Sequence, residues 1–441
     1  MTGTVVRRAS RRHWRIVFAV FACTLLGVAR ADDDALPATP VLTEQAAIEQ
    51  AVSANPGLDE MRRRADAAAA VPDQAGSLPD PRITLGAANL PVDTFSLDQE
   101  AMTQLQLGVT QAFPYPGKRA LQRDVAASRA AAAAQSADEA RLQLVRNVRN
   151  TWWELFYLDR AQGTLRRNMG LLRQLVDVAR TKYEVGRGLQ QDVLLAQVEL
   201  ARLQDMLVRV DGARGVSAAR LNALLARPAD TPVRLPPATA ARLPDVPPEA
   251  SLERAADQSR AAIAAARHQL DAAQSAEALA HKEYLPEFGV SVNYGFRQGR
   301  NPNGTPRADF ASVMLNFSVP LFARSKQDRL VDQRHAEAAA AARGLADTRN
   351  RVQADIAAAL AGYRQARDEY QLLDTGILPQ TGQAVASMLA GYQVNKVDFL
   401  TLVRTQITLY DHELQRWRAL AQAHQAYANL LAAVGRETLD E

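Results

Sequence analysis

The residues that could bind a metal or carry out catalysis are few and widely spaced in this sequence. Beyond residue 31 the histidines are His268, His281, His335, His412 and His424. No two of them stand at the spacing of a metal site, and Asp411, His412 and Glu413 point to different faces of a helix because they are consecutive. A phosphate-binding glycine loop and a nucleophile elbow are also absent from the sequence. The sequence therefore predicts no catalytic residue, no metal site and no cofactor, and the protein is not expected to be an enzyme.

Charged residues of both signs gather instead at two short turns. The first turn opens at Tyr183 and the second at Tyr392, and we expect both tyrosines to pack at the ends of helical hairpins. The charged residues concerned are Arg187 and Asp192 in the first turn and Lys396 and Asp398 in the second. Both aspartates precede a helical pattern, so their carboxylates are predicted to cap the helices by accepting backbone N–H groups. The two basic residues are interpreted as solvated charges.

The first 31 residues have the pattern of a secretory signal peptide. Five arginines precede an apolar run from Ile16 to Val28, and Ala29-Arg30-Ala31 offers small residues at the cleavage positions. A membrane anchor is the weaker interpretation, because the run is shorter than the ~20 residues that span a bilayer. The mature chain is expected to start at Asp32, without Cys23, the only cysteine, which lacks the residues of a good lipoprotein cleavage site before it. No disulfide or thiolate site is then possible.

Loss of this segment would also change the charge balance. The whole chain has a formal net charge of +4, and without the six arginines of the segment 46 basic residues face 48 acidic residues, which gives −2. The basic character of the full sequence is therefore no evidence for a nucleic-acid partner, and none is expected. No later apolar stretch approaches ~18 residues, so strands would have to make any membrane-crossing segment.

The rest of the sequence contains two copies of one unit. At an offset of 208, residues 109–120 (VTQAFPYPGKRA) align with 317–328 (FSVPLFARSKQD), which places Lys118 on Lys326. Leu78-Pro79-Asp80 matches Leu285-Pro286-Glu287 at an offset of 207. Such self-similarity indicates two equivalent halves. The expected divisions are a signal peptide at 1–31, a first repeat at 32–227, a proline-rich linker at 228–249, a second repeat at 250–435 and a tail at 436–441.

Each repeat is predicted to run helix, strand, strand, long helix, turn, helix. In the first repeat the predicted pieces are a helix at 57–77, strands at 82–89 and 103–113, and a helix at 118–185. In the second they are a helix at 250–284, strands at 287–296 and 309–319, and a helix at 324–394 with a kink at Gly376 and Pro379.

The strands alternate apolar and polar residues. Between 287 and 296 the apolar positions are Phe288, Val290, Val292, Tyr294 and Phe296, and the strand at 309–319 repeats the pattern with Met314 as its exception. Such strands occur between lipid and water, and equally in a soluble sheet that covers a core. The signal peptide and the long helices favour the membrane. Because four strands cannot close a barrel, this interpretation requires an oligomer.

The helices are predicted to pack against one another over long distances. A helix at 118–185 would be about 100 Å long at 1.5 Å per residue, more than a globular core needs. Apolar residues at heptad spacing follow both turns: Val193, Ala196, Leu200, Leu203, Leu207 and Val210, then Leu400, Val403, Ile407, Tyr410, Leu414, Trp417, Ala421 and His424. His424 is expected to be a core histidine with its hydrogen bonds satisfied. The cluster of Trp152, Trp153, Phe156 and Tyr157 is predicted to pack in the core.

The pattern resembles the TolC-type outer-membrane efflux family, in the branch paired with heavy-metal and drug pumps of the resistance-nodulation-division class. The resemblance rests on the two-fold repeat, on Gln111 to Arg119 at the strand-to-helix junction, on Asn55-Pro56, and on Tyr183-Glu-Val-Gly186 followed by Asp192. It covers essentially the whole mature chain. It implies a mainly α fold with a transmembrane β part: a homotrimer with twelve strands in one outer-membrane β-barrel and long α-helical hairpins in a periplasmic helical barrel.

The resemblance also implies partners and sites. A periplasmic adaptor, or membrane fusion protein, and an inner-membrane pump would deliver substrate to a passive duct set in outer-membrane lipid. The implied gate residues at the periplasmic tip are Asp192, Asp398, Arg187 and Lys396. The implied adaptor contacts are Tyr183, Val185, Gly186, Tyr392, Val394 and Asn395. The sequence does not say whether the cargo is a metal ion, a drug or another small molecule.

The second turn departs from the family's pattern. Asn395 stands where glycine is usual, the turn from Tyr392 to Asp398 is three residues shorter than that from Tyr183 to Asp192, and Thr401 replaces a second acid found in some relatives. A strong acidic ring at the entrance is therefore not expected.

The junction between strand and long helix has its own residues. Pro114 and Pro116 offer no N–H to a ladder, Gly117 permits a bend, and Lys118 is predicted to begin the helix. The second junction keeps Pro320. Lys118 and Arg119 are interpreted as lying at lipid headgroups or as solvated charges.

The alternative function is a soluble periplasmic coiled-coil scaffold or adaptor with the strands in a small folded domain. Adaptors usually carry one helical hairpin flanked by β domains, whereas two hairpins alternate with two strand pairs in this sequence.

Overall fold

The computed structural model describes residues 41–237 and 242–439, which belong to one compact unit, Val41–Glu441. The predicted signal peptide at 1–31, with Cys23, lies outside the described residues, and so do positions 238–241 of the predicted linker and 440–441 of the predicted tail. Cleavage before Asp32 therefore stays a prediction.

The first half of the unit follows the predicted order of elements from residue 56 onward, with one helix divided in two, and it has an additional helix, α1, that was not predicted. Its elements are α1 (Glu44–Ala54), α2 (Pro56–Ala69), α3 (Val71–Ala75), β1 (Arg82–Ala88), β2 (Gln104–Phe113), α4 (Lys118–Glu184) and α5 (Gln190–Leu224). The predicted helix at 57–77 corresponds to α2 and α3, because Pro72 has no N–H to continue the ladder of α2. Asn55 caps α2 by accepting a hydrogen bond from the N–H of Leu58 at 3.1 Å. The long helix α4 agrees with its prediction to within one residue.

The second half differs from its prediction at two helices. Its elements are α6 (Glu249–Ser259), α7 (Ala261–Lys282), β3 (Phe288–Phe296), β4 (Phe310–Phe317), a 3-10 turn (Ala323–Ser325), α8 (Gln327–Gln371), a π-helical turn (Leu372–Ile377), α9 (Leu378–Gln393) and α10 (Phe399–Val434). The predicted helix at 250–284 breaks at Arg260, where the backbone of Gly435 packs closely against it. A Cβ atom on residue 435 would lie only 2.8 Å from the Cα of Arg260. The predicted helix at 324–394 starts later, at Gln327, and its regular hydrogen bonding is interrupted just before Pro379.

The four strands form one antiparallel sheet in the order β1-β2-β3-β4. Each half contributes one hairpin, and β2 and β3 join the two halves, with Phe113 opposite Phe288 at the end of the ladder. The sheet is therefore a single structure built across the repeat boundary.

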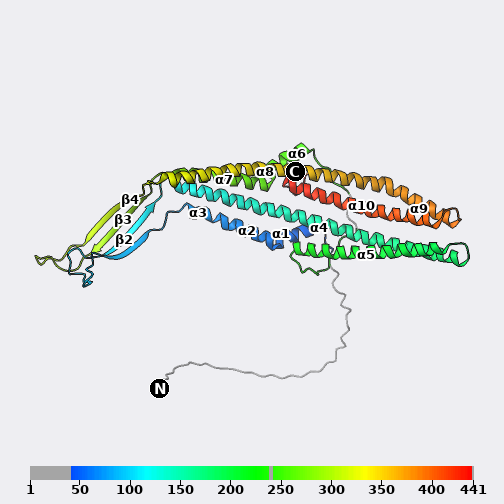
Figure 1. The fold of residues 1–441 in the computed structure, drawn as a ribbon, viewed down its shortest axis with the longest axis horizontal. Coiled ribbons are helices and arrows are strands. Elements are labelled where there is room, and N and C mark those ends of the chain that lie inside the picture. The colour runs from blue at the N-terminus through cyan, green and yellow to red at the C-terminus, as the bar shows by residue number, and fades with distance from the viewer. Residues whose placement is uncertain (1–40, 238–241, 440–441) are drawn as a thin grey trace, which may run out of the picture. The chain divides into compact units, whose positions relative to one another are not determined.

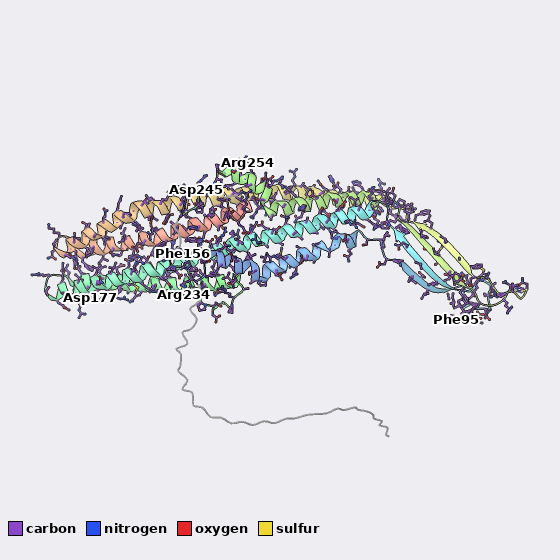
Figure 2. The ribbon with its side chains drawn as sticks, turned by 180° about the vertical axis from the view of Figure 1, so that it is seen from behind. Phe95, Phe156, Asp177, Arg234, Asp245 and Arg254 are labelled. Carbon is purple, nitrogen blue, oxygen red and sulfur yellow. The ribbon has the colours of Figure 1, made fainter. Side chains whose placement is uncertain are left out.

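Helix α4 is the central helix of the unit and packs against α2, α5, α7 and α10. Figure 1 shows the sheet at one end of the helices and the α4–α5 and α9–α10 turns at the other end. In Figure 2, Phe156 lies near the middle of the helices, Asp177 towards the turns, and Phe95 beyond the strands at the opposite end. One chain thus carries a sheet and two helix-helix turns at opposite ends of the same long helix.

The core follows the α4 helix, and its largest cluster is the predicted aromatic group. Trp152, Trp153, Phe156 and Tyr157 are all buried, and the Trp152 indole donates a hydrogen bond to the carbonyl of Leu42 at 3.0 Å. The predicted heptad positions Ala196, Leu203, Val403 and Tyr410 are buried between the helices. Leu400 is an exception: it is exposed, because Phe399 and Leu402 fill the space at the start of α10 instead.

Candidate functional site

The strand register brings the apolar residues of all four strands to one face of the sheet. Val109 of β2 lies between Ile83 of β1 and Val292 of β3, and Val292 lies opposite Val313 of β4. The same alternation places these further residues on that face: Leu85, Leu105, Leu107, Phe113, Phe288, Val290, Tyr294, Phe296, Leu315 and Phe317. We call this set the apolar sheet face. Most of its side chains are exposed, with values up to 78% for Leu85.

The opposite face of the sheet is polar or small except at Phe310 and Met314 of β4, and it is better covered in the two central strands, β2 and β3. The hydroxyl oxygens of Thr110 and Ser291 lie 2.9 Å apart, and Asn316 donates to the same Ser291 hydroxyl at 3.3 Å. Ser291 itself is buried. Water-soluble sheets have the reverse arrangement, with the apolar face on the core, so a contiguous exposed apolar face indicates contact with a membrane or another chain. Within the described residues, the outer edges of β1 and β4 also have no strand partner.

The first strand-to-helix junction is built as predicted in its backbone. β2 ends at Phe113, directly before Pro114 and Pro116, and Gly117 adopts a φ of +93° that side-chain-bearing residues avoid. The next residue, Lys118, begins α4.

The side chain of Lys118 contradicts both predicted interpretations, because it is neither at a lipid surface nor solvated. Only 1% of Lys118 is exposed, and its Nζ lies 3.1 Å from a carboxylate oxygen of Glu283 and 3.1 Å from one of Glu287. These two acids flank the step from α7 to β3 in the second repeat. Lys118 therefore ties the start of α4 to the other half of the chain.

The second junction is built differently. β4 ends at Phe317, three residues before Pro320, and a 3-10 turn precedes α8. Lys326, the repeat counterpart of Lys118, is exposed, and so are Leu321 at 79% and Phe322 at 77%. The two junctions therefore share a position in the repeat and differ in their surroundings.

The two helix-helix turns have the same length, which corrects the predicted difference of three residues. The α4–α5 turn comprises Val185 to Leu189, and the α9–α10 turn comprises Val394 to Asp398. Gly186 and Asn395 occupy the same place with φ values of +72° and +60°. Asparagine tolerates this left-handed conformation better than most residues, so it replaces the usual glycine without changing the turn.

The two aspartates of the turns are not equivalent. Asp398 is the N-cap of α10, as predicted: its carboxylate accepts from the N–H of Thr401 and from the Thr401 hydroxyl, both at 2.8 Å. These hydrogen bonds hold the pKa of Asp398 below its usual range. Asp192 does not cap α5, because the N-cap position is occupied by Leu189. Asp192 lies in the first turn of α5 instead, where a negative charge is still favourable.

A lysine that the sequence did not single out links the two turns. Lys182, in the last turn of α4, donates to the carbonyl of Tyr392 at 2.8 Å and to the Asn395 side-chain oxygen at 2.8 Å. Its Nζ also lies 3.9 Å from the Tyr392 ring centroid. No short motif marks Lys182 in the sequence, since its partners belong to the other repeat.

The predicted tip residues differ in how much of them is exposed. Tyr392 is 5% exposed and packs against Phe399, whereas Tyr183 is 46% exposed. Among the described residues, Arg187 and Lys396 form no ion pair with Asp192 or Asp398. Together the two turns line an open groove of about 880 Å³ that contains Arg187, Lys396 and both aspartates.

The family model described as outer membrane efflux protein matches the sequence over residues 47–227 and again over residues 252–436. The two matches cover most of the chain and include both strand hairpins and both turns. The chain belongs to the outer membrane efflux protein family. No curated protein matches its sequence at a significant level.

Solved structures of outer-membrane proteins share the fold of this chain. The outer membrane protein VceC from Vibrio cholerae is 19% identical, with a TM-score of 0.75 over 89% of this chain and 96% of that chain. The CmeC outer membrane channel of Campylobacter jejuni is 13% identical, with a TM-score of 0.74 over 90% of this chain and 89% of that chain. The MtrE outer membrane channel of Neisseria gonorrhoeae, solved in its open state, is 16% identical, with a TM-score of 0.75 over 89% of each chain.

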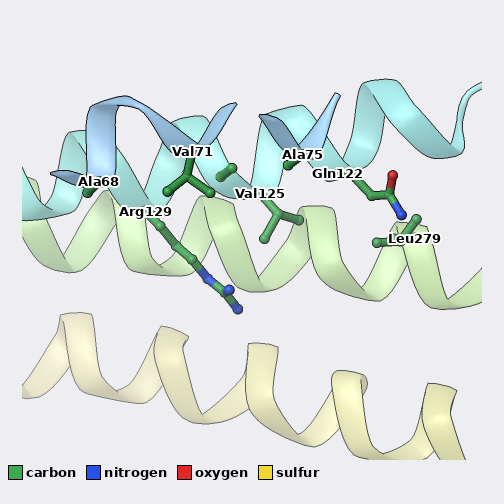
Figure 3. A pocket seen from close by; sticks show the side chains of 8 residues that line it. Ala68, Val71, Ala75, Gln122, Val125, Arg129 and Leu279 are labelled. Carbon is green, nitrogen blue, oxygen red and sulfur yellow. The ribbon is translucent and has the colours of Figure 1, made fainter. Parts of the chain in front are cut away.

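Outside the turns and junctions, the described part of the chain has open grooves between helices. Figure 3 shows one such groove of about 570 Å³, lined by alanine and valine side chains of α2, α3 and α4 and by Leu279 of α7, with Arg129 extending past it. Across residues 41–237 and 242–439, no group of three or more His, Cys, Asp or Glu side chains is placed to hold a metal ion. None of the helices in that part of the chain is both long and apolar enough to cross a lipid bilayer.

Proposed function

We propose that this chain is one protomer of a homotrimeric, passive export duct. The duct is set in the outer membrane and extends into the periplasm, where it receives substrate from an inner-membrane pump of the resistance-nodulation-division class through a periplasmic adaptor. The duct consumes no energy and performs no chemistry. The observation that carries the proposal is the exposed apolar sheet face.

The apolar sheet face supports membrane insertion by strands. Its exposed residues include Ile83, Leu107, Val292, Leu315 and Phe317, one or more from every strand. Strands in a lipid bilayer must pair all their backbone groups, which requires a closed barrel. Four strands with two free edges do not close, so other copies must supply the missing strands. The polar face then lines a water-filled bore.

The helix-helix turns support contact with an adaptor at the opposite end. Val185, Leu189 and Val394 are exposed apolar residues on the turns, a placement that suits a protein contact. Of the expected adaptor-contact residues, Tyr392 is buried against Phe399 of its own chain. We therefore assign the contact with the adaptor to Tyr183, Val185, Gly186, Val394 and Asn395. Asp192, Arg187 and Lys396 remain the proposed gate charges, with Asp398 chiefly a helix cap.

A soluble periplasmic scaffold or adaptor is the competing function. It requires the apolar sheet face to lie on a core, and the helices of this chain leave that face exposed. The exposure of the apolar sheet face therefore favours the duct over the soluble scaffold.

Conductance recording tests the proposal. Full-length protein purified in detergent is added to planar bilayers, alone and as the Asp192→Asn and Lys182→Met double variant, which loosens the tip. Stepwise conductance from at least the variant, together with a heat-modifiable oligomer in outer-membrane fractions, is the expected result. A freely soluble monomer with no conductance from either protein would overturn the duct and favour the scaffold.

A further inference from the structure

The two junction lysines of the repeat have different surroundings. Lys118 is enclosed and paired with two carboxylates, whereas Lys326, at an offset of 208, is exposed. Within the described part of the chain, the Lys326 ammonium has no ion pair or side-chain hydrogen bond. The second repeat therefore has the lysine, but none of the described residues of the same chain pairs with its side chain.

One of the two acidic partners of Lys118, Glu287, also has an acidic repeat counterpart. Glu287 follows Leu285-Pro286 and directly precedes β3, and Asp80 follows Leu78-Pro79 and precedes β1, at an offset of 207. Asp80 is exposed and, like Lys326, has no ion pair among the described residues. Lys326 and Asp80 are thus two opposite charges without an ion-pair partner among the described residues, one near each free edge of the sheet.

The geometry inside the chain shows how these charges can meet. Lys118 follows the end of β2 and reaches Glu287 at the start of β3 because β2 and β3 are neighbours, with Phe113 opposite Phe288. The free edges are β4, which precedes Lys326, and β1, which follows Asp80. In a closed ring of copies, β4 of one copy neighbours β1 of the next. Lys326 then follows a strand, β4, that neighbours the strand preceded by Asp80, just as Lys118 follows a strand, β2, that neighbours the strand preceded by Glu287. The connection is longer in the second junction, where Lys326 stands nine residues after Phe317 and Lys118 only five after Phe113.

We propose that Lys326 of one copy forms an ion pair with Asp80 of a second copy, and that this pair fixes the β4 edge against the β1 edge. The inference rests on the proposed function, because it requires a closed ring. Two further observations support a second copy as the occupant. The opposite charges stand at complementary edges. Leu321 and Phe322, exposed before Lys326, correspond at the offset of 208 to Phe113 and Pro114 of the first junction, where Phe113 lies opposite Phe288 of the neighbouring strand.

Charge reversal in the full-length protein tests the pair. Lys326→Glu and Asp80→Lys each place like charges together, so each is expected to lower by several degrees the temperature at which the oligomer dissociates in SDS. The double variant restores opposite charges in the reverse order and is expected to recover most of the loss. Arg329→Glu is the matched control, since Arg329 lies one turn further along α8 and pairs with Asp332 of its own helix.

Amine labelling gives a readout that does not depend on oligomer stability. The chain has five lysines, Lys118, Lys182, Lys282, Lys326 and Lys396. Lys326 is expected to resist labelling in the intact oligomer and to react after dissociation, while Lys396 at the turns reacts in both states.

The outcomes separate this inference from the duct itself. If the unmodified oligomer forms and conducts, but the double variant shows no recovery and Lys326 is labelled freely, the pair is wrong and the duct stands. Protection of Lys326 that appears only when anionic lipid vesicles are added also overturns the pair, because it assigns the lysine to lipid headgroups. If the unmodified protein forms no oligomer, both the pair and the duct are wrong.

Discussion

The ion pairs of Lys118 predict that substituting the lysine and substituting its two glutamate partners lower the free energy of unfolding by different amounts. Changing Glu283 and Glu287 together to Gln leaves an ammonium group that is 1% exposed without a carboxylate, and breaking a buried pair in this way costs about 3–5 kcal/mol. Changing Lys118→Met leaves two carboxylates that water still reaches, so we expect a smaller loss. Urea unfolding of refolded protein in detergent measures both. Equal losses would contradict the buried position of Lys118.

His424 predicts an acid-dependent loss of stability. Burial lowers its pKa to about 4 from 6.5, and its ring stacks on Trp153 at a centroid distance of 3.7 Å. The unfolded chain takes up a proton below pH 6.5 and the folded chain does not until pH 4, so stability falls as the pH drops between these values. The loss from pH 7 to pH 5 amounts to roughly 2 kcal/mol.

The variant His424→Phe keeps a ring against Trp153 and removes the titrating group, so its stability should change less between pH 7 and pH 5. Thermal unfolding at the two pH values provides the measurement. His281→Gln is the control, because His281 is exposed and its side chain has no hydrogen bond or ion pair among the described residues, so the substitution removes an imidazole without removing a contact. The sequence predicted a core histidine with its hydrogen bonds satisfied. His424 is partly buried against Trp153, and its Nε2 has no hydrogen-bond partner among the described residues, contrary to that expectation.

At the scale of the elements, neighbouring residues of β4 test which sheet face meets lipid. Leu315 lies on the apolar sheet face and Asn316 on the polar face. A lysine facing lipid costs about 2–4 kcal/mol near the middle of the bilayer and little in a water-filled bore. Leu315→Lys should therefore reduce the heat-modifiable protein in the outer membrane strongly, and Asn316→Lys should not. Similar yields for both variants would mean that lipid does not cover the apolar sheet face.

The two helical hairpins are linked at their tips by Lys182, which predicts a conformational role. Lys182→Met removes both hydrogen bonds to the α9–α10 turn while keeping the length of the side chain. If the tips restrict the duct, this variant should show a larger conductance than the unmodified protein in planar bilayers. Arg180→Met is the control, since among the described residues Arg180 pairs only with Glu184 of its own helix. An increase in conductance with both variants would point to general loosening of α4.

The elements that the sequence predicted well are those with local causes. Alternation within 287–296 predicted β3 to within one residue, and the length of α4 followed from an uninterrupted helical pattern. The helix break at Arg260 depends on contact with Gly435. The burial of Lys118 depends on glutamates more than 160 residues further along the chain. Neither feature can therefore be predicted from the neighbouring sequence. The turn lengths were misjudged because they were counted from motif residues, whereas Gly186 and Asn395 define where each turn bends.

At the scale of the whole molecule, the sheet sets a lower limit on the number of copies in the duct. Each chain supplies four strands, with apolar residues on one face and polar residues on the other. Two copies would close a barrel of eight strands, whose interior is just filled by side chains and leaves no water path. Three copies give twelve strands and room for a bore lined by the polar face. Native mass spectrometry of the detergent-solubilised protein should therefore return at least three chains per particle, and three for the proposed homotrimer. A stable dimer that still conducts would contradict this relation between strand number and bore.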